Sequence, residues 1–330
     1  MKIKGLNLYI ILFLLCSLSS RASFVLLPME AEGQQNHLKA YGITYWALDK
    51  SYKVSWLLNY RGGSFLLPDA PEIRKECQIR GVTFEVLSDA ATNSILEDIS
   101  SPSQNMETVV LEKAPKIAVY TPKGKQPWDD AVTMVLTYAE IPYTEIYDEE
   151  VLSDQLLLYD WLHLHHEDFT GQYGKFFGNY RSTPWYIQQK ADAEALAKKL
   201  GYNKVSEEKL AVAKKIRDFV IGGGFMFAMC SATDSFDIAL SAEGVDICEP
   251  MFDGDDSDAN YQTRIDYSNT FAFKDYTLVR NPMVYEFSDI DTTEQHGKGA
   301  FSMDKDYFTL MEYSAKWDPI PTMLCQNHTQ

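Results

Sequence analysis

An apolar run that follows three consecutive glycines determines the class of fold open to this chain. The run covers residues 225–229, as expected for a central, buried strand of a parallel sheet. Beyond it, Phe236, Ala239 and Leu240 recur at helical spacing. The chain must therefore turn at Cys230, and the pattern of strand, sharp turn and helix predicts an α/β fold.

A cysteine on a strand-to-helix turn lies at the carboxyl end of the sheet, beside the backbone N–H groups that begin the helix. Such groups lower the pKa of a thiol and stabilise an oxyanion. Cys230 is therefore a candidate nucleophile, with Ser231 and Ala232 as the elbow and oxyanion residues. Ala228 and Ala232 stand where glycines are usual. The alternative is that Cys230 is a small buried apolar residue that ends a strand.

The first residues predict a secretory signal peptide over 1–22. Two lysines precede an apolar run over 6–15, and small residues occupy the positions that signal peptidase reads before a cut after Ala22. Cys16 suggests a lipoprotein as an alternative, but Leu15 before it is large for a lipobox. No later apolar run is long enough to cross a bilayer. We therefore expect a secreted or periplasmic protein without a membrane span.

The charge balance is strongly acidic. The formal net charge is -17, and removal of the leader leaves 27 basic against 47 acidic residues. Nucleic acid is therefore excluded as an expected partner, because phosphate binding requires the opposite sign. A small-molecule substrate is expected and no cofactor is predicted, whereas the oligomeric state stays open.

Four cysteines remain after the predicted cleavage, namely Cys77, Cys230, Cys248 and Cys325. They are too few in so long a chain for a disulfide scaffold, although an oxidising compartment permits pairing. A disulfide at Cys230 would exclude its use as a nucleophile.

Residues 23–105 predict a small N-terminal α/β unit. Helices are expected at 37–49, 72–80 and 90–99, a hairpin from 52–60 and 64–68, and a strand at 82–87. The polar stretch 100–104 is the predicted boundary loop.

Residues 106–330 predict a second α/β domain, with a flavodoxin-like parallel sheet and helices on both faces. Strands are expected at 117–120, 144–147 and 156–164, and helices at 127–139, 185–200 and 207–220. The loops 121–128 and 165–173 then share one edge of the sheet with Cys230, where active sites of open α/β sheets lie.

The second candidate cluster is His163 to Asp168. On a strand His163 and His165 point to the same face, with His166, Glu167 and Asp168 just beyond the strand end. These donors suit a metal site, or a base and substrate contacts, or a strand end that is merely hydrogen-bonded.

Two loops near this edge allow more than one interpretation. Residues 170–176, which include Tyr173, indicate either a ligand-facing loop or a surface turn with packed aromatics. Residues 253–260 have the oxygen density of a calcium loop but lack its glycine and terminal glutamate, so a solvated acidic turn is expected. Asp237 is expected to face solvent.

Beyond Gly244 the alternation of strands and helices stops. Residues 270–274, 276–280, 283–287 and 307–313 predict a β-rich elaboration. A sheet of this kind is also expected to receive another strand and helix, so we expect the domain to be truncated at its C-terminus.

The order of elements over 116–244, with Phe227-Ala228-Met229-Cys230-Ser231-Ala232, resembles the class I glutamine amidotransferase-like superfamily. The stretches 55–65 and 161–169 are in addition similar to secreted proteins catalogued as asparagine synthetase B-like. The resemblance implies a flavodoxin-like fold with Cys230 as thiol nucleophile and its neighbouring amides as oxyanion hole. Asparagine synthesis is not expected, because Arg61-Gly62-Gly63-Ser64-Phe65 lacks the aspartate of the synthetase ATP loop.

The family takes its histidine from a later strand end, and no such motif follows Cys230, so His165 or His166 is the predicted base. Glu167 and Tyr173 are the predicted substrate contacts. The leading hypothesis is a secreted, cysteine-dependent amide hydrolase. The alternatives are a non-catalytic envelope binding protein and a metal-dependent enzyme that uses the His163 to Asp168 cluster.

Overall fold

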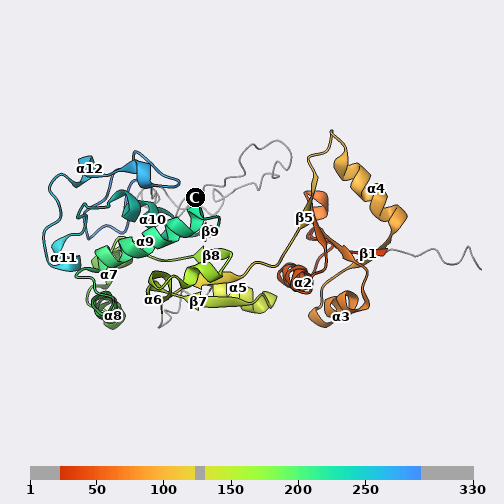
Figure 1. Cartoon of the computed structure of the whole chain (residues 1–330), viewed down its shortest axis with the longest axis horizontal. Coiled ribbons are helices and arrows are strands. Elements are labelled where there is room, and N and C mark those ends of the chain that lie inside the picture. Colours follow the sequence, from red (N-terminus) through yellow and green to blue (C-terminus); the bar gives the residue numbers. More distant parts are fainter. Residues whose placement is uncertain (1–22, 123–130, 291–330) are drawn as a thin grey trace, which may run out of the picture. The chain divides into compact units, whose positions relative to one another are not determined.

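The computed structural model describes residues 23–122 and 131–290, which fall into two compact units (Figure 1). The first unit ends at Ala114 and the second begins at Pro115, apart from residues 138–141, which group with the first.

The first unit is an antiparallel sheet with strand order β4-β1-β3-β2-β5. Its strands are β1 (Ser23–Leu27), β2 (Val54–Leu58), β3 (Phe65–Pro68), β4 (Glu85–Ser88) and β5 (Glu107–Leu111). Its helices are α2 (His37–Asp49), α3 (Pro71–Arg80) and α4 (Asp89–Ser100). Buried side chains of α2 and α3 pack on one face of the sheet, and Ile99 of α4 packs on the other. The three predicted helices and the hairpin of β2 and β3 are confirmed.

The end of the first unit differs from the expected boundary at residue 105. After the loop at 100–104 the chain returns as β5, which pairs antiparallel with β2 over five residues from Glu107↔Leu58 to Leu111↔Val54. The first unit therefore includes a strand that the sequence pattern did not indicate.

The turn at Arg61-Gly62-Gly63 has a structural explanation. All three residues have positive φ, and a Cβ added to Gly62 would lie 2.5 Å from the carbonyl carbon of Met29. The guanidinium of Arg61 bridges Glu30 at 2.5 Å and Glu85 at 2.8 Å. The turn at Arg61-Gly62-Gly63 therefore ties the loop at Met29 and Glu30 to strand β4 within the first unit.

The second unit contains a parallel sheet with strand order β7-β6-β8-β9. The strands are β6 (Ile117–Tyr120), β7 (Tyr143–Ile146), β8 (Trp161–Leu164) and β9 (Phe225–Ala228). The main helices are α5 (Ala131–Ala139), α6 (Asp148–Leu152), α8 (Pro184–Lys199), α9 (Val205–Ile221) and α10 (Ala232–Ser241). Counted within the unit, this order is 2-1-3-4, as in the flavodoxin-like arrangement, and the predicted α/β class is confirmed.

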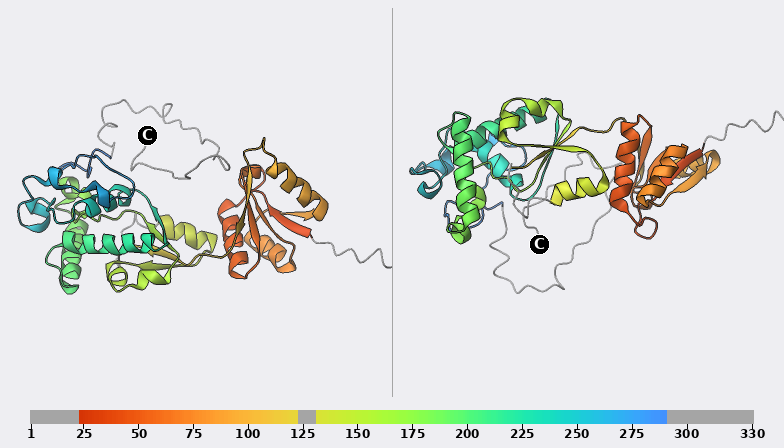
Figure 2. Two further views of the ribbon diagram at one scale, coloured as in Figure 1. Left: turned by 45° about the horizontal axis from the view of Figure 1, so that its top comes forward. Right: turned by 90° about the horizontal axis from the view of Figure 1, so that it is seen from below.

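Apolar residues of α6, α9 and α10 cover one face of this sheet. The connection from β6 to β7 runs toward one edge of the sheet, whereas the connections to β8 and β9 run toward the other edge. Because such connections are right-handed, α5 lies on the face opposite to α6, α9 and α10 (Figure 2). Far from α5, on β9, Phe225 is 56% exposed and Phe227 41% exposed. The expectation that β9 is a central, buried strand is wrong for the described residues, because β9 is the edge strand there and only one of its faces is packed.

Two other local predictions are corrected. In the segment 156–164 only Trp161–Leu164 is a strand, since Gln155–Leu158 forms the 3₁₀ helix η2. Asp237 does not face solvent, because it is 2% exposed and accepts the backbone N–H groups of residues 271, 272 and 273 at 2.8–2.9 Å.

The β-rich elaboration predicted beyond Gly244 is wrong for the described residues. Up to residue 290 the chain forms α11 (Pro250–Asp253), α12 (Tyr261–Arg264), the 3₁₀ helix η4 (Tyr267–Asn269) and turns, with one antiparallel bridge between Leu278 and Ser288. Its apolar residues pack on α10 instead of pairing as strands. The predicted strand 307–313, the leader 1–22 and the first residues of the predicted helix 127–139 lie outside the described residues.

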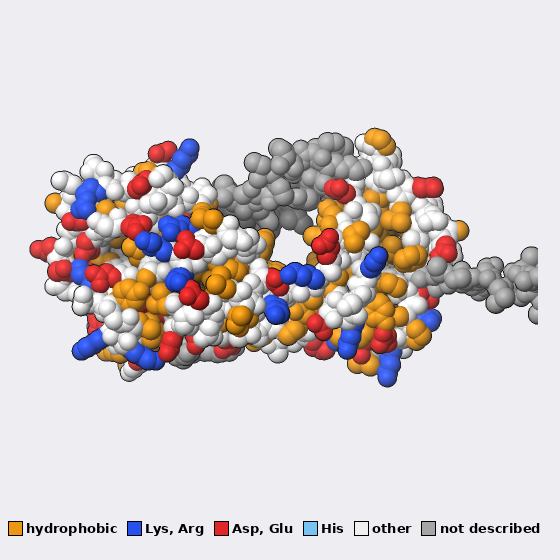
Figure 3. Space-filling model, viewed as in Figure 1, with side chains coloured by type: hydrophobic (Ala, Val, Ile, Leu, Met, Phe, Trp, Pro, Cys, Tyr) orange, Lys and Arg blue, Asp and Glu red, His pale blue; other side chains and the backbone are white. Residues whose placement is uncertain are grey.

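None of the helices in the described ranges combines the length and the apolar character that a bilayer crossing requires. On the face shown in Figure 3, acidic and basic side chains of the described residues are mixed, with hydrophobic side chains between them.

Candidate functional site

A cavity of about 660 Å³ lies at the carboxyl edge of the parallel sheet. Pro122 after β6 and His166, Glu167 and Asp168 after β8 form part of its wall, and α8 supplies another part. Strands β6 and β8 are neighbours at which the chain order reverses, and ligands of open α/β sheets bind outside such a switch point. The cavity therefore occupies the place where this architecture is expected to hold a ligand.

Three of the predicted site residues line this cavity, namely His166, Glu167 and Tyr173. Cys230, Ser231, Ala232 and His165 are not among its lining residues. Cys230 is therefore not part of the cavity wall that these three residues help to form.

Cys230 forms the sharp corner that the sequence predicts. It has φ +53°, between β9 and α10, and is half-buried. A left-handed backbone at a residue other than glycine costs energy and is frequent at active sites. Among the described cysteines, Cys77, Cys230 and Cys248 are not joined to one another by a disulfide.

Two of the backbone N–H groups near the corner, those of Ala232 and Thr233, donate hydrogen bonds within the fold. The N–H of Ala232 donates to the carbonyl oxygens of Met229 at 3.2 Å and His165 at 3.4 Å. The N–H of Thr233 donates to the carbonyl oxygen of Cys230 at 3.0 Å. The predicted contribution of Ala232 to an oxyanion hole is therefore weakened, because a donor that already binds two carbonyls has little capacity for a substrate oxygen.

The three neighbouring histidines occupy different environments. His163 is 7% exposed within β8 and stacks on Phe227, with ring centroids 5.4 Å apart. His165 and His166 follow the strand, with ring centroids 3.6 Å apart. Burial lowers the pKa of His163 to about 4, and burial together with the neighbouring His166 and His163 lowers that of His165 to about 4. His165 is thus a weak base at neutral pH.

A buried ion pair beside the cavity escaped the sequence analysis. The ammonium of Lys209 on α9 lies 2.7 Å and 2.9 Å from the carboxylate oxygens of Asp148, and donates to the hydroxyls of Tyr120 and Tyr147 at 3.0 Å. Although burial opposes it, the charge of Asp148 raises the pKa of Lys209. A signal was present in the sequence, because Lys209 falls on the apolar face of α9, four residues after Val205.

The loop from Asp168 to Phe176 forms an aromatic wall of the cavity. Asp168 holds it by accepting the N–H groups of Thr170 at 2.7 Å and Gly174 at 2.9 Å. Lys175 is 2% exposed and its ammonium donates to the carbonyl of Val279 at 2.9 Å. The loop therefore lines the cavity and is anchored at both ends, while Tyr173 also packs on Tyr186 and Phe252.

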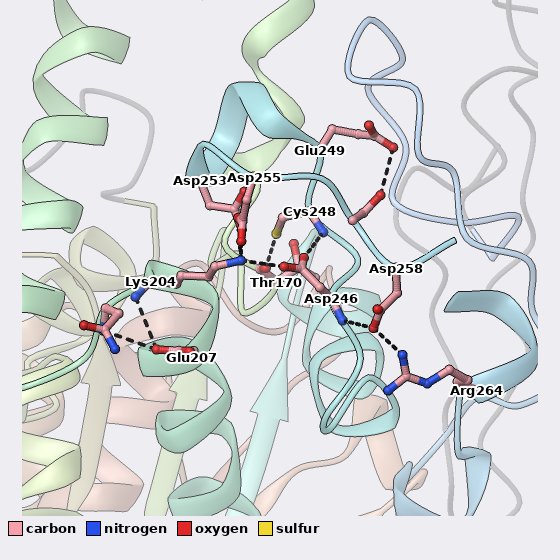
Figure 4. A network of polar contacts seen from close by, with 12 residues as sticks. Thr170, Lys204, Glu207, Asp246, Cys248, Glu249, Asp253, Asp255, Asp258 and Arg264 are labelled. Atoms are coloured by element: carbon pink, nitrogen blue, oxygen red, sulfur yellow. Dashed lines mark hydrogen bonds and ion pairs between the residues drawn. The ribbon is translucent and has the colours of Figure 1, made fainter. Parts of the chain in front are cut away.

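In the described part of the chain, one group of three possible metal ligands has its ligand atoms within 4.8 Å of one another, namely Asp246, Cys248 and Asp253. The predicted histidine cluster does not form such a group among the described residues. Figure 4 shows the ammonium of Lys204 among these acids, 2.5 Å from Asp246 and 3.0 Å from Asp253.

A second acid of the predicted solvated turn, Asp255, lies 2.6 Å from the same ammonium. Burial raises the pKa of the Cys248 thiol well above its usual value, and the thiol donates to the carbonyl of Thr170 at 3.2 Å. These acids therefore already have a cationic partner in the ammonium of Lys204.

Comparison with protein-family models finds no match for this chain, and comparisons with curated proteins and with solved structures find none either.

Proposed function

We propose that this chain is a binding protein for a small polar organic molecule, held in the cavity at the carboxyl edge of the parallel sheet. The observation that carries the proposal is the position of the cavity at the switch point between β6 and β8. Its volume of about 660 Å³ lies within the range of small-molecule sites. The predicted leader would place this binding function outside the cytoplasm.

The composition of the wall supports binding more than catalysis. The lining contains both aromatic and charged side chains, which provide contact area and a few polar groups that orient a ligand. The predicted nucleophile is absent from the wall, and His165 carries a lowered pKa. The alternative of a non-catalytic envelope protein is therefore the function that the geometry favours.

The test is a thermal-shift screen with small amines, carboxylates, neutral amides and sugars. A ligand of the cavity stabilises the folded state by about 2.7 kcal/mol at a concentration 100 times its Kd, and so raises the melting temperature. In the variant Ala193→Trp an indole enters the cavity from α8, and this shift is expected to disappear.

Ala195→Trp is the matched control, since Ala195 is exposed on the same helix and does not line the cavity. It should retain the full shift. The proposal fails if no compound stabilises the wild-type protein, or if stabilising compounds act equally on the Ala193→Trp variant.

The second candidate is the cysteine-dependent amide hydrolase that the amidotransferase-like resemblance implies, and the left-handed φ of Cys230 favours it. If it is correct, Cys230→Ala abolishes hydrolysis of small amides and labelling by iodoacetamide at that position, with an unchanged fold by circular dichroism. Hydrolysis that persists in this variant, or a folded wild-type protein that shows no hydrolysis, removes this candidate.

A further inference from the structure

We infer that the cavity at the carboxyl edge of the parallel sheet selects a positively charged ligand, an organic amine that also carries an apolar group. This inference rests on the proposed binding function and adds the chemical class of the ligand.

The charges of the wall are the first argument. Four carboxylates line the cavity against two ammonium groups. Both ammonium groups are already engaged, because Lys199 lies 3.0 Å from both oxygens of Glu149 and Lys209 is paired with Asp148. The lining therefore holds more carboxylates than ammonium groups, with Asp168 and Asp192 outside both of these ion pairs, and this excess attracts a cation and repels an anion.

The aromatic rings are the second argument. Tyr147, Tyr173, Phe176 and Trp185 line the same cavity. Two of these rings already attract ammonium groups of the chain, since the Lys209 nitrogen lies 4.3 Å from the ring centre of Tyr147 and the Lys190 nitrogen 5.5 Å from that of Tyr173. Rings combined with carboxylates form the kind of site that binds organic ammonium ions.

An acceptor without a partner is the third argument. The side-chain oxygen Oε1 of Gln189 is buried in the lining of the cavity and has no hydrogen-bond partner among the described residues. Buried polar atoms are nearly always paired in folded proteins. Because this atom accepts hydrogen bonds, it favours a neighbouring donor group, and an organic ammonium ion carries donors whereas a carboxylate does not.

The test compares three probes of similar size by isothermal titration calorimetry on the purified chain: 2-phenylethylammonium, 3-phenylpropanoate and 3-phenylpropanamide. We expect the ammonium ion to bind at least about tenfold more tightly than the carboxylate. Asp192→Asn should weaken binding of the ammonium ion about fivefold, since it removes a negative charge from the wall.

Asp218→Asn is the control, because it removes the same charge at an exposed position of α9 that does not line the cavity. It should leave all three affinities unchanged. If the carboxylate binds as tightly as the ammonium ion, and Ala193→Trp abolishes both, the inference on charge is overturned while the binding function stands. If none of the three probes binds, the inference is overturned, and the broader thermal-shift screen decides the binding function separately.

Discussion

Replacement of Lys209 by methionine is expected to destabilise the protein by about 3–5 kcal/mol. The ammonium of Lys209 is the partner of Asp148, and the two side chains are 7% and 2% exposed. Without it the carboxylate of Asp148 is buried without a counter-charge, and the hydroxyl of Tyr147 loses a donor. Urea-induced unfolding at pH 7, followed by fluorescence, measures the change in the free energy of unfolding.

Two further variants make this prediction specific to the buried pair. Lys199→Met removes an exposed ammonium that pairs with Glu149, and it should cost less than about 1 kcal/mol. The double variant Lys209→Met, Asp148→Leu removes both charges and should recover more than half of the lost stability, because most of the cost comes from the uncompensated charge. Equal costs for Lys209→Met and Lys199→Met would show that the pair does not stabilise the fold.

The sequence predicted the parts of the fold that depend on local periodicity. The apolar run before Cys230 corresponds to β9 to within one residue, and the helical spacing after it corresponds to α10. The helices α8 and α9 follow from the same argument. Such patterns are visible along the chain because strands and helices bury side chains at fixed intervals.

What could not be predicted depends on contacts between distant segments. Lys209 and Asp148 are 61 residues apart, so their ion pair has no signature except a charge on an apolar helix face. The residues beyond Gly244 alternate as strands do, yet the carboxylate of Asp237 binds three consecutive amides at 271–273 and holds them as a loop. In both cases tertiary contacts override the local pattern.

The candidate site was likewise predicted in part from local patterns and in part not. The alternation of strands and helices indicated that the loops after the strands meet at the carboxyl edge of the sheet, because the carboxyl ends of parallel strands share one side. The cavity lies at that edge. That Cys230 does not line the cavity was not predicted, since the lining depends on which side chains from distant segments face the cavity. His163 shows this most clearly, because its place within the sheet makes it a buried residue of β8 rather than a ligand or a base.

The same burial makes His163 a source of pH-dependent stability. Burial lowers its folded-state pKa to about 4, below the value of 6.5 for an unperturbed histidine. Between these values the unfolded chain binds a proton that the folded protein does not, so the stabilisation is complete at pH 7 and is lost as the pH falls from about 6.5 to 4. A difference of about 2.5 pKa units corresponds to about 3 kcal/mol.

The variant His163→Phe isolates this contribution, because phenylalanine keeps a ring against Phe227 but does not titrate. Other groups change stability over the same range; for example, burial raises the pKa of Glu208 to about 8, which acts in the opposite direction. The effects of groups whose pKa does not depend on His163 cancel when the two proteins are compared at each pH. Relative to the variant, wild type should lose about 3 kcal/mol between pH 7 and pH 4 in urea unfolding experiments. A difference that stays constant with pH would show that His163 titrates alike in the folded and unfolded chain, and its imidazole would then be in contact with water rather than packed in the sheet.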